Sequence, residues 1–402
     1  MDIYLISVLA FFAILAVIIW RDRKNIEVKY VLLLRRTKKG GKFIDGIVKI
    51  SPRFWKVLGT IGVLVCIYVM VTSLYSIALT LDLMFKKIIT VPTIQFLLPT
   101  PSSQIVKGTA FIGIPFWFWI IVVATVMFPH ELMHGIMMRT EKIRIKSVGL
   151  LMLLIFPGAF VDPYEKEFKK TKFMSKLRIV AGGSFANFLT AFFLLYLTVL
   201  VIWPTFVGPG VVITSVNSTA PAGKIGLKEG MVIQKIGNKT MDATYFDFFG
   251  TYGGLMFFSS NTTVEDIKAV SSSMLLRSEL KTHKPGDNVT LVVDGSKYDI
   301  TLGTNPAEPE LPYIGVNTIL NAKDHSQSAF TVLFPLLSLC VLLTYGIGMF
   351  NILPIYPLDG GLIVEAITEK ISPRYSRRIV ELITFITLML IFFSFAGPFI
   401  IK

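Results

Sequence analysis

The sequence is poor in the residues that most often form covalent crosslinks or hold metals. Its 402 residues include 2 cysteines and 4 histidines. Cys66 and Cys340 both lie inside apolar runs, which argues against a disulfide framework and against a cysteine-based zinc site. A metal site in this chain must therefore draw on histidine and carboxylate side chains.

Charged residues are scarce as well. They make up 16% of the chain and hydrophobic residues 53%, a balance that excludes an ordinary soluble protein and is typical of a polytopic membrane protein. No basic region precedes the first apolar stretch, so we interpret it as a retained span rather than a signal peptide. Six stretches approach or exceed the roughly 20 residues that a helix needs to cross a bilayer. These candidate spans are residues 3–20, 57–79, 111–138, 179–203, 330–355 and 379–400.

Acidic residues are fewer than basic ones, 26 against 40, which gives a formal charge of +14. The basic residues gather in alternate loops: twelve in 21–56 and ten in 139–178, but three in 80–110. This alternation follows the positive-inside rule for an even number of spans. We therefore expect a multi-pass cell-membrane protein with both termini extracytoplasmic, contacts with the lipid bilayer, and no nucleic-acid partner.

Residues 204–329 differ from the rest of the chain. They are polar, alternate like strands at 211–216 and 289–293, and contain four Asn-x-Ser/Thr sequons, which fits an extracytoplasmic domain. The sequons begin at Asn217, Asn238, Asn261 and Asn288.

Two segments of this region, 220–233 and 284–291, resemble a bacterial-type PDZ domain. The resemblance covers residues 207–305, with the aromatic- and Gly-rich piece 241–263 read as an insertion. PDZ domains capture peptides by strand addition. The alternative is a purely steric module or scaffold.

A zinc-ligand motif lies at the end of the third apolar stretch, His130-Glu131-x-x-His134. On a helix, positions i and i+4 share one face, so both imidazoles can ligate one Zn²⁺. Glu131 then projects beside the metal, where it can take a proton from the bound water. The alternative is a pair of satisfied core histidines.

A catalytic zinc usually takes three protein ligands. His283 and His325 lie in the external region, so the third ligand should be a carboxylate in or beside another span. Asp359 stands out because two prolines and two glycines in 351–361 break the helix around it and can bend the backbone inward. A plain helix end with an exposed Asp is the alternative. The candidates are Asp162, Asp359, Glu365 and Glu381.

Two further segments carry polar or helix-breaking residues at membrane depth. Gly182 and Gly183 allow close helix approach. Asn187 either donates to an oxyanion or to the substrate backbone, or ties helices together. Residues 148–160 are apolar, too short to span, and contain a Pro-Gly turn signal. We expect there either a β-hairpin that dips into the membrane and pairs with an unwound substrate or an amphipathic surface loop.

Three motifs in this order resemble the site-2 protease family of intramembrane metalloproteases. They are His130-Glu131-x-x-His134, Gly183-x-x-x-Asn187, and the Asn351…Pro354…Asp359-Gly360 pattern. The resemblance covers residues 111–400. It implies that His130, His134 and Asp359 bind one zinc ion, that Glu131 is the general base, and that the hairpin holds an extended substrate.

The chain departs from the family pattern at two places. Ser184 stands where many members have proline, and Gly158-Ala159 stands where a glycine pair is commoner. Neither departure touches a proposed ligand, so both put substrate geometry in question more than catalysis.

The expected fold is a polytopic α-helical membrane protein of about six spans with a membrane-embedded β-hairpin and an inserted extracytoplasmic PDZ-like α/β domain. Its expected parts are residues 1–110 (two N-terminal spans), 111–203 (first half of the core), 207–305 (PDZ-like domain) and 306–402 (second half).

We expect hydrolysis within transmembrane protein substrates already trimmed by another protease, near the cytoplasmic side. Glu131 would activate the zinc-bound water, with Asn187 or Asn351 stabilising the oxyanion. The rival functions are a peptide receptor or chaperone and a divalent-metal transporter.

Overall fold

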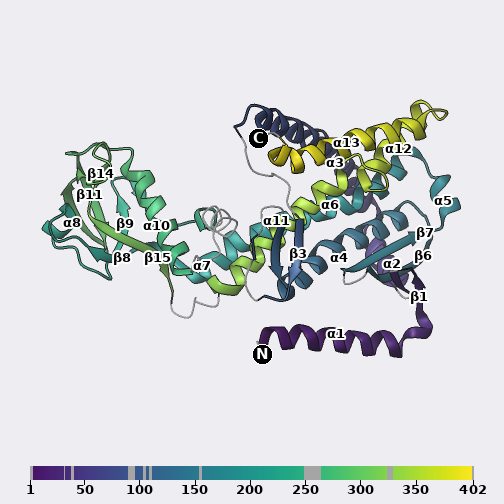
Figure 1. Ribbon diagram of the computed structural model, residues 1–402, viewed down its shortest axis with the longest axis horizontal. Coiled ribbons are helices and arrows are strands. Elements are labelled where there is room, and N and C mark those ends of the chain that lie inside the picture. The colour runs from purple at the N-terminus through teal and green to yellow at the C-terminus, as the bar shows by residue number, and fades with distance from the viewer. Residues whose placement is uncertain are drawn as a thin grey trace. The chain divides into compact units, whose positions relative to one another are not determined.

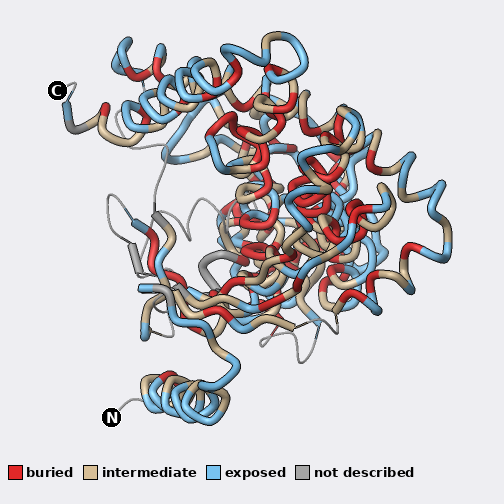
Figure 2. Tube along the Cα trace, turned by 90° about the vertical axis from the view of Figure 1, so that its right-hand side faces the viewer, coloured by how far each residue is buried: buried red, intermediate tan, exposed pale blue. Residues whose placement is uncertain are grey.

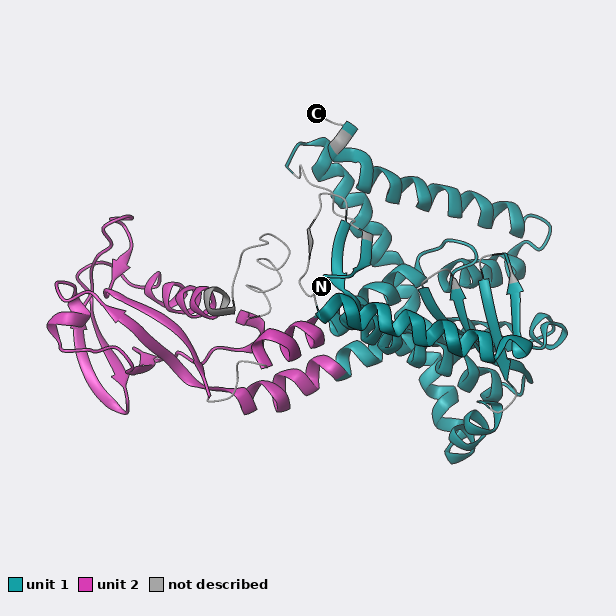
Figure 3. Ribbon diagram, turned by 60° about the horizontal axis from the view of Figure 1, so that its bottom comes forward, with its two compact units in different colours: residues 1–193, 339–402 teal, residues 194–338 magenta. Residues whose placement is uncertain are grey.

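The computed structural model describes residues 3–30, 32–37, 40–88, 96–102, 106–107, 111–153, 156–248, 264–323 and 329–400. The sequon at Asn261, His325 and most of the expected insertion 241–263 lie outside these residues. The chain divides into two compact units (Figure 3). Unit 1 comprises residues 1–193 and 339–402, and unit 2 residues 194–338.

Six helices within the described residues are long and apolar enough to cross a membrane, which confirms the expected polytopic architecture. Four coincide with single elements and two continue through short π-helical segments. They are α1 (Ile3–Arg21), α3 (Pro52–Phe85), α4 (Phe116–Thr140), α6 (Phe173–Leu197) continued by η2 (Thr198–Ile202) and α7 (Trp203–Phe206), η3 (Ala329–Leu333) with α11 (Phe334–Ile352), and α13 (Ser376–Ile400).

The helix α3 shows why these segments suit a membrane. Large apolar side chains at positions 57, 61, 64, 68, 71, 75 and 79 are exposed, and their three- and four-residue spacing puts them on one face. The opposite face buries Gly59 and Gly62 against α4 and α6. A Cβ at Gly62 would lie 2.8 Å from the Phe185 ring, so glycine is what allows the two helices to approach so closely.

Two expected span boundaries are corrected. Residues 111–115 form strand β5 (Phe111–Pro115), and the helix begins at Phe116 after Pro115. Here β5 lies between β3 (Phe96–Thr100) and β4 (Val106–Lys107) in a three-stranded sheet. The fifth span ends at Ile352 rather than 355, because Pro354 cannot continue the helix ladder.

Unit 1 also contains a four-stranded sheet beside α4, in the order β1-β2-β6-β7 (Figure 1). Strands β6 (Ile145–Leu153) and β7 (Phe156–Pro163) form an antiparallel pair over the expected hairpin segment. The N-terminal strands β1 (Ile26–Lys29) and β2 (Leu32–Thr37) extend it, with β2 antiparallel to β6. That this sheet lies at membrane depth stays a prediction.

The remaining helices of unit 1 are short. They are α2 (Gly40–Ile50), α5 (Glu165–Lys169) and α12 (Asp359–Ile371). In Figure 2 the N-terminal helix α1 is almost wholly intermediate or exposed. Helices α4 and α6 contribute many of the buried residues of unit 1.

Unit 2 is built on a six-stranded sheet of order β12-β11-β9-β8-β15, with β10 paired to β9. Helix α10 (Val264–Leu280) packs against β15, and the core is aliphatic. The strands are β8 (Val207–Val216), β9 (Val232–Ile236), β10 (Lys239–Thr240), β11 (Asn288–Val293), β12 (Ser296–Thr301) and β15 (Val316–Ala322); the small elements are α8 (Pro221–Lys224), β13 (Gly303–Thr304) and β14 (Pro312–Tyr313).

The first residues of the expected insertion serve as a packing element. Tyr245 and Phe248 are fully buried against Trp203, Phe330 and Phe334. The Trp203 indole donates to the Ala243 carbonyl at 2.9 Å. These aromatic contacts anchor the sheet to the helical segments of unit 2.

Candidate metal centre

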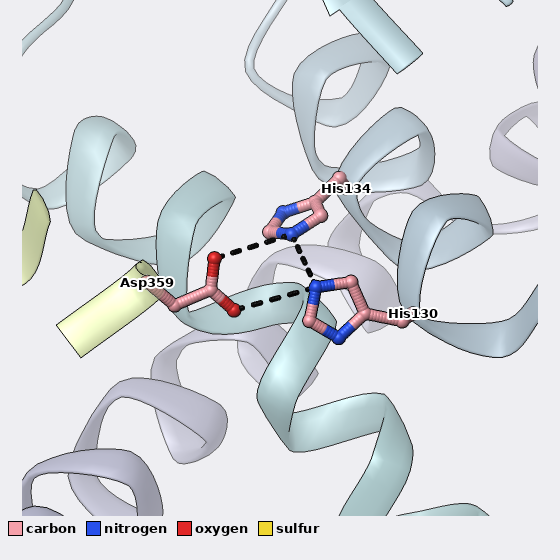
Figure 4. A group of neighbouring side chains, drawn as sticks. All are labelled: His130, His134 and Asp359. Atoms are coloured by element: carbon pink, nitrogen blue, oxygen red, sulfur yellow. Dashed lines mark hydrogen bonds and ion pairs between the residues drawn. The ribbon is translucent and has the colours of Figure 1, made fainter. Parts of the chain in front are cut away.

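Three nearly buried side chains converge inside unit 1. His130 and His134 project from one face of α4, and Asp359 is the first residue of α12. Their side chains are 11%, 14% and 10% exposed, and they point toward one another (Figure 4). The sequence motif and the helix-broken segment around Asp359 therefore meet at one place.

The distances suit a single metal ion. The two Nε2 atoms lie 3.1 Å apart, and Asp359 oxygens lie 3.6 Å from His130 Nε2 and 3.4 Å from His134 Nε2. Donors held at about 2.0–2.1 Å by a tetrahedral zinc stand roughly 3.3 Å from one another. Two histidines and one carboxylate are also a donor set found in catalytic zinc sites.

Glycine makes room for this convergence. A Cβ at Gly183 would lie 2.3 Å from His134 Nε2 and 2.6 Å from His130 Nε2, inside the space between the imidazoles. A Cβ at Gly360 would lie 1.9 Å from the Ile352 carbonyl oxygen. The first turn of α12 therefore packs directly on the end of α11, and this contact brings Asp359 to the histidines.

Each histidine has a partner for its outer nitrogen. His134 Nδ1 lies 2.7 Å from the Ile179 carbonyl oxygen, to which only a protonated nitrogen can donate. This contact selects the tautomer that leaves the Nε2 lone pair free for a metal. His130 Nδ1 lies 3.2 Å from the Asn187 side-chain amide.

The Asn187 amide fits best with its oxygen facing His130. As drawn, its Nδ2 faces the ring and its Oδ1 is buried without a hydrogen-bond partner. Amide oxygen and nitrogen are assigned from hydrogen bonding, and exchanging them lets Oδ1 accept from His130 Nδ1–H. That arrangement pairs the oxygen, moves the amide nitrogen to the position that lacks a hydrogen-bond partner, and directs the His130 Nε2 lone pair to the space shared with His134 and Asp359.

Ser184 is the site residue that the sequence did not reveal. Its backbone N–H and its hydroxyl both donate to Asp359 Oδ2, at 3.2 and 2.7 Å, and the side chain is fully buried. Proline, common in the family at this position, could supply neither donor. The only sign of this role in the sequence was the departure from the family pattern.

Glu131 lies on α4 between the two histidines in sequence, and its Oε2 accepts a hydrogen bond from the Val161 backbone amide of β7 at 3.0 Å. The hydrogen bond with Val161 uses only Oε2 of Glu131, and Oε1 takes no part in it. Asn351 lies in the last turn of α11, and none of its described contacts joins it to the three converging side chains.

Two of the three other carboxylates considered as ligands are engaged elsewhere, and none of the three belongs to the converging group. Asp162 is bound to Arg36 and Ser147, and Glu381 accepts from Arg377 at 2.9 Å. Partial burial, and after it the neighbouring Glu369, raises the pKa of Glu365. His283 lies in unit 2, 3.7 Å from a Glu279 oxygen. Asp359 is therefore the candidate that completes the site.

Comparison with known proteins agrees with this geometry. The family model "Peptidase family M50" matches residues 118–394. The chain is also 26% identical over 378 residues to an uncharacterized protein of Methanocaldococcus jannaschii, with 90% of this chain and 87% of the relative covered. The matched region contains both histidines, Glu131 and Asp359 together with all of unit 2. The chain therefore belongs to peptidase family M50, the site-2 protease family of membrane metalloproteases.

Proposed function

We propose that this protein is a zinc-dependent intramembrane endopeptidase that cleaves transmembrane segments of other membrane proteins. The observation that carries the proposal is the convergence of His130, His134 and Asp359, with Glu131 beside them, on helices of a polytopic membrane fold. Idle ionisable groups at membrane depth are costly. A buried cluster of this composition is therefore retained for a task.

The proposed cofactor is one Zn²⁺ held by His130, His134 and Asp359, with Ser184 orienting the carboxylate and Asn187 orienting His130. Zinc supplies a water of lowered pKa and polarises the scissile carbonyl.

Glu131 is the proposed general base. The Val161 amide fixes Oε2, so the free oxygen takes the proton from the attacking water and later passes it to the leaving amine. Asn351 is proposed to donate to the developing oxyanion. The contact between the Asn187 side-chain amide and His130 Nδ1 supports an orienting role for that residue.

The substrate is proposed to bind as a strand along β7. The Val161 N–H points away from β6 and donates to Glu131. Residues two apart on a strand direct their N–H groups to the same side, so the Ala159 N–H also points away from β6, toward the outer edge of β7. A cavity of about 1000 Å³ lies beside residues 157–159, between α1 and α4, and it is lined mainly by apolar side chains. An unwound substrate segment could exchange its helical hydrogen bonds for those of the β7 edge there.

The sidedness proposals rest on the loop charges and on unit 2. We propose an active site near the cytoplasmic face and both termini and unit 2 outside, where the PDZ-like residues 207–305 select substrates already trimmed by another protease. Among the described residues, the sheet of unit 2 ends at β15, which lies beyond residue 305, pairs with β8 and packs against α10; its outer edge suits peptide capture. If removing residues 207–305 left the preference for trimmed over intact substrate unchanged, the selection proposal would fail.

The test uses purified full-length protein in lipid nanodiscs with a helical single-span substrate. Zinc content and cleavage are measured for the wild type, Glu131→Gln and Asp359→Asn. Glu131→Gln should keep zinc and lose cleavage, and Asp359→Asn should lose or weaken zinc. Full function of Glu131→Gln would instead indicate a peptide receptor, and zinc transport across vesicles without cleavage would indicate a transporter.

A further inference from the structure

The carboxylate of Glu131 is held by a strand whose end lacks regular pairing. Its partner Val161 lies near the end of β7, where the β6–β7 register shifts between Ile145 and Ser147. Beyond the shift, Ile145 faces Pro163, which has no N–H to donate. Between Val161 and Tyr164, whose N–H donates to the Arg144 carbonyl at 3.1 Å, the backbone pairing of β7 with β6 is therefore irregular.

A side-chain network closes that end instead. The Arg36 guanidinium of β2 reaches across β6 to the Asp162 carboxylate and donates to Ser147 Oγ at 2.9 Å. The Ser147 hydroxyl in turn donates to Asp162 Oδ2 at 3.2 Å. Arg36 also lies over the Phe160 ring, 5.0 Å from its centroid.

The sheet geometry explains why the network forms. Ser147 is paired with Asp162 and Gly149 with Phe160, so these side chains share one face of the sheet. Arg36 is paired with Gly149, which has no side chain to stand between the guanidinium and β7. Three strands are thus joined one residue from the amide that holds Glu131.

We propose that Arg36 is a positioning residue for the proteolytic reaction. By clamping Asp162 it fixes the Val161 amide and, through that amide, the orientation of the Glu131 carboxylate. Arg36 lies outside residues 118–394, the part of the chain that the M50 family model covers. In this proposal, the N-terminal strands supply a positioning residue from outside the part of the chain that the family model covers. This inference rests on the proposed role of Glu131.

The effect should fall on kcat rather than on KM. The part of β7 proposed to bind substrate pairs regularly with β6, from Leu150–Ala159 to Leu153–Phe156. The register shift lies at the opposite end of the hairpin, beyond the Arg36 network, so loss of Arg36 should leave the substrate-binding part in place. A misplacement of about 1 Å in a catalytic group can cost up to 100-fold in rate. For Arg36→Ala we expect kcat to fall about tenfold, with KM within about twofold of wild type.

The kinetic test measures cleavage of the helical substrate in nanodiscs by Arg36→Ala, Asp162→Asn and the double variant. Because the two residues act as one unit, the double variant should lose no more than either single one. Arg36→Lys should recover most of the loss. Arg144→Ala is the matched control, since Arg144 also joins the base of the hairpin to a carboxylate, Glu167 at 2.6 Å, and its other side-chain contact is with the Tyr164 ring, one residue beyond β7, rather than with Asp162. It should keep wild-type kcat.

A second measurement does not depend on activity. Backbone hydrogen exchange in residues 156–163 should accelerate in Arg36→Ala and stay unchanged in Arg144→Ala, with equal thermal unfolding midpoints. The proposal would be overturned if Arg36→Ala changed neither kcat nor hydrogen exchange. It would also be overturned if Arg36→Ala raised KM instead of lowering kcat, or if the losses of the two single variants multiplied in the double variant. A wild type without cleavage would instead refute the proposed function, and the exchange result would still decide whether Arg36 clamps β7.

Discussion

The Ser184 hydroxyl should contribute directly to metal affinity. Ser184 is fully buried on α6 and gives Asp359 Oδ2 two hydrogen bonds, the shorter from the hydroxyl at 2.7 Å. Ser184→Ala removes the hydroxyl and leaves the backbone donor. The carboxylate then keeps one fixed contact instead of two, while its desolvation is unchanged.

The magnitude follows from the charge on the acceptor. A hydrogen bond to a charged group contributes about 1.5–3 kcal/mol, and roughly 1.4 kcal/mol corresponds to a tenfold change in a binding constant. Zinc affinity should therefore fall by about 10- to 100-fold, the range usual for residues that orient a metal ligand.

The assay is zinc retention against a chromophoric chelator, with the protein in nanodiscs. The control is Ser175→Ala, because Ser175 lies on the same helix and its hydroxyl also donates to a carboxylate, that of Glu141. The control should bind zinc as the wild type does. A Ser184→Ala protein that unfolds normally and binds zinc within about twofold of wild type would refute the reasoning.

Three further predictions concern other parts of unit 1. Asn187→Ala should weaken zinc binding by about 10- to 100-fold in the same assay, whereas normal zinc binding with a lowered kcat would favour an oxyanion role. Arg178→Ala leaves the Glu141 carboxylate, 6% exposed, with the Ser175 hydroxyl but without its cationic partner 2.8 Å away, so the free energy of unfolding in detergent should fall by about 3 kcal/mol; Arg144→Ala, at an exposed pair, should cost at most about 1 kcal/mol. Leu15→Trp, which fills the cavity between α1 and α4, should raise KM about tenfold with zinc content unchanged, whereas Ile14→Trp, at an exposed position of α1, should leave KM as it is.

The convergence of His130, His134 and Asp359 could be predicted because each residue lies in a recognisable local sequence. The spacing of His130 and His134 fixes their common helix face, and the prolines and glycines around Asp359 mark a broken helix. Ser184 and Arg36 could not be found in this way. Their roles depend on which helices pack together and on the register of strands far apart in the chain, and neither is encoded in a local pattern.

The N-terminal strands and the boundary of α4 show a second limit. Counting charges in 21–56 indicates a side of the membrane but not a conformation, so β1 and β2 were interpreted only as part of a basic loop. The apolar residues 111–115 suit a strand and a helix equally well. What decided between them was pairing with β3 and β4.

The donors come from the two sides of unit 2: both histidines precede it in the chain, and Asp359 follows it. Since a chain is made from its N-terminus, a growing polypeptide carries the two imidazoles long before it carries the carboxylate. An incomplete protein that stops before α12 lacks the third ligand, and it also lacks the Ser184 acceptor that closes α6 onto α12. The group of three side chains that could hold a metal is therefore complete only after all of unit 2 has been synthesised and the chain has re-entered unit 1.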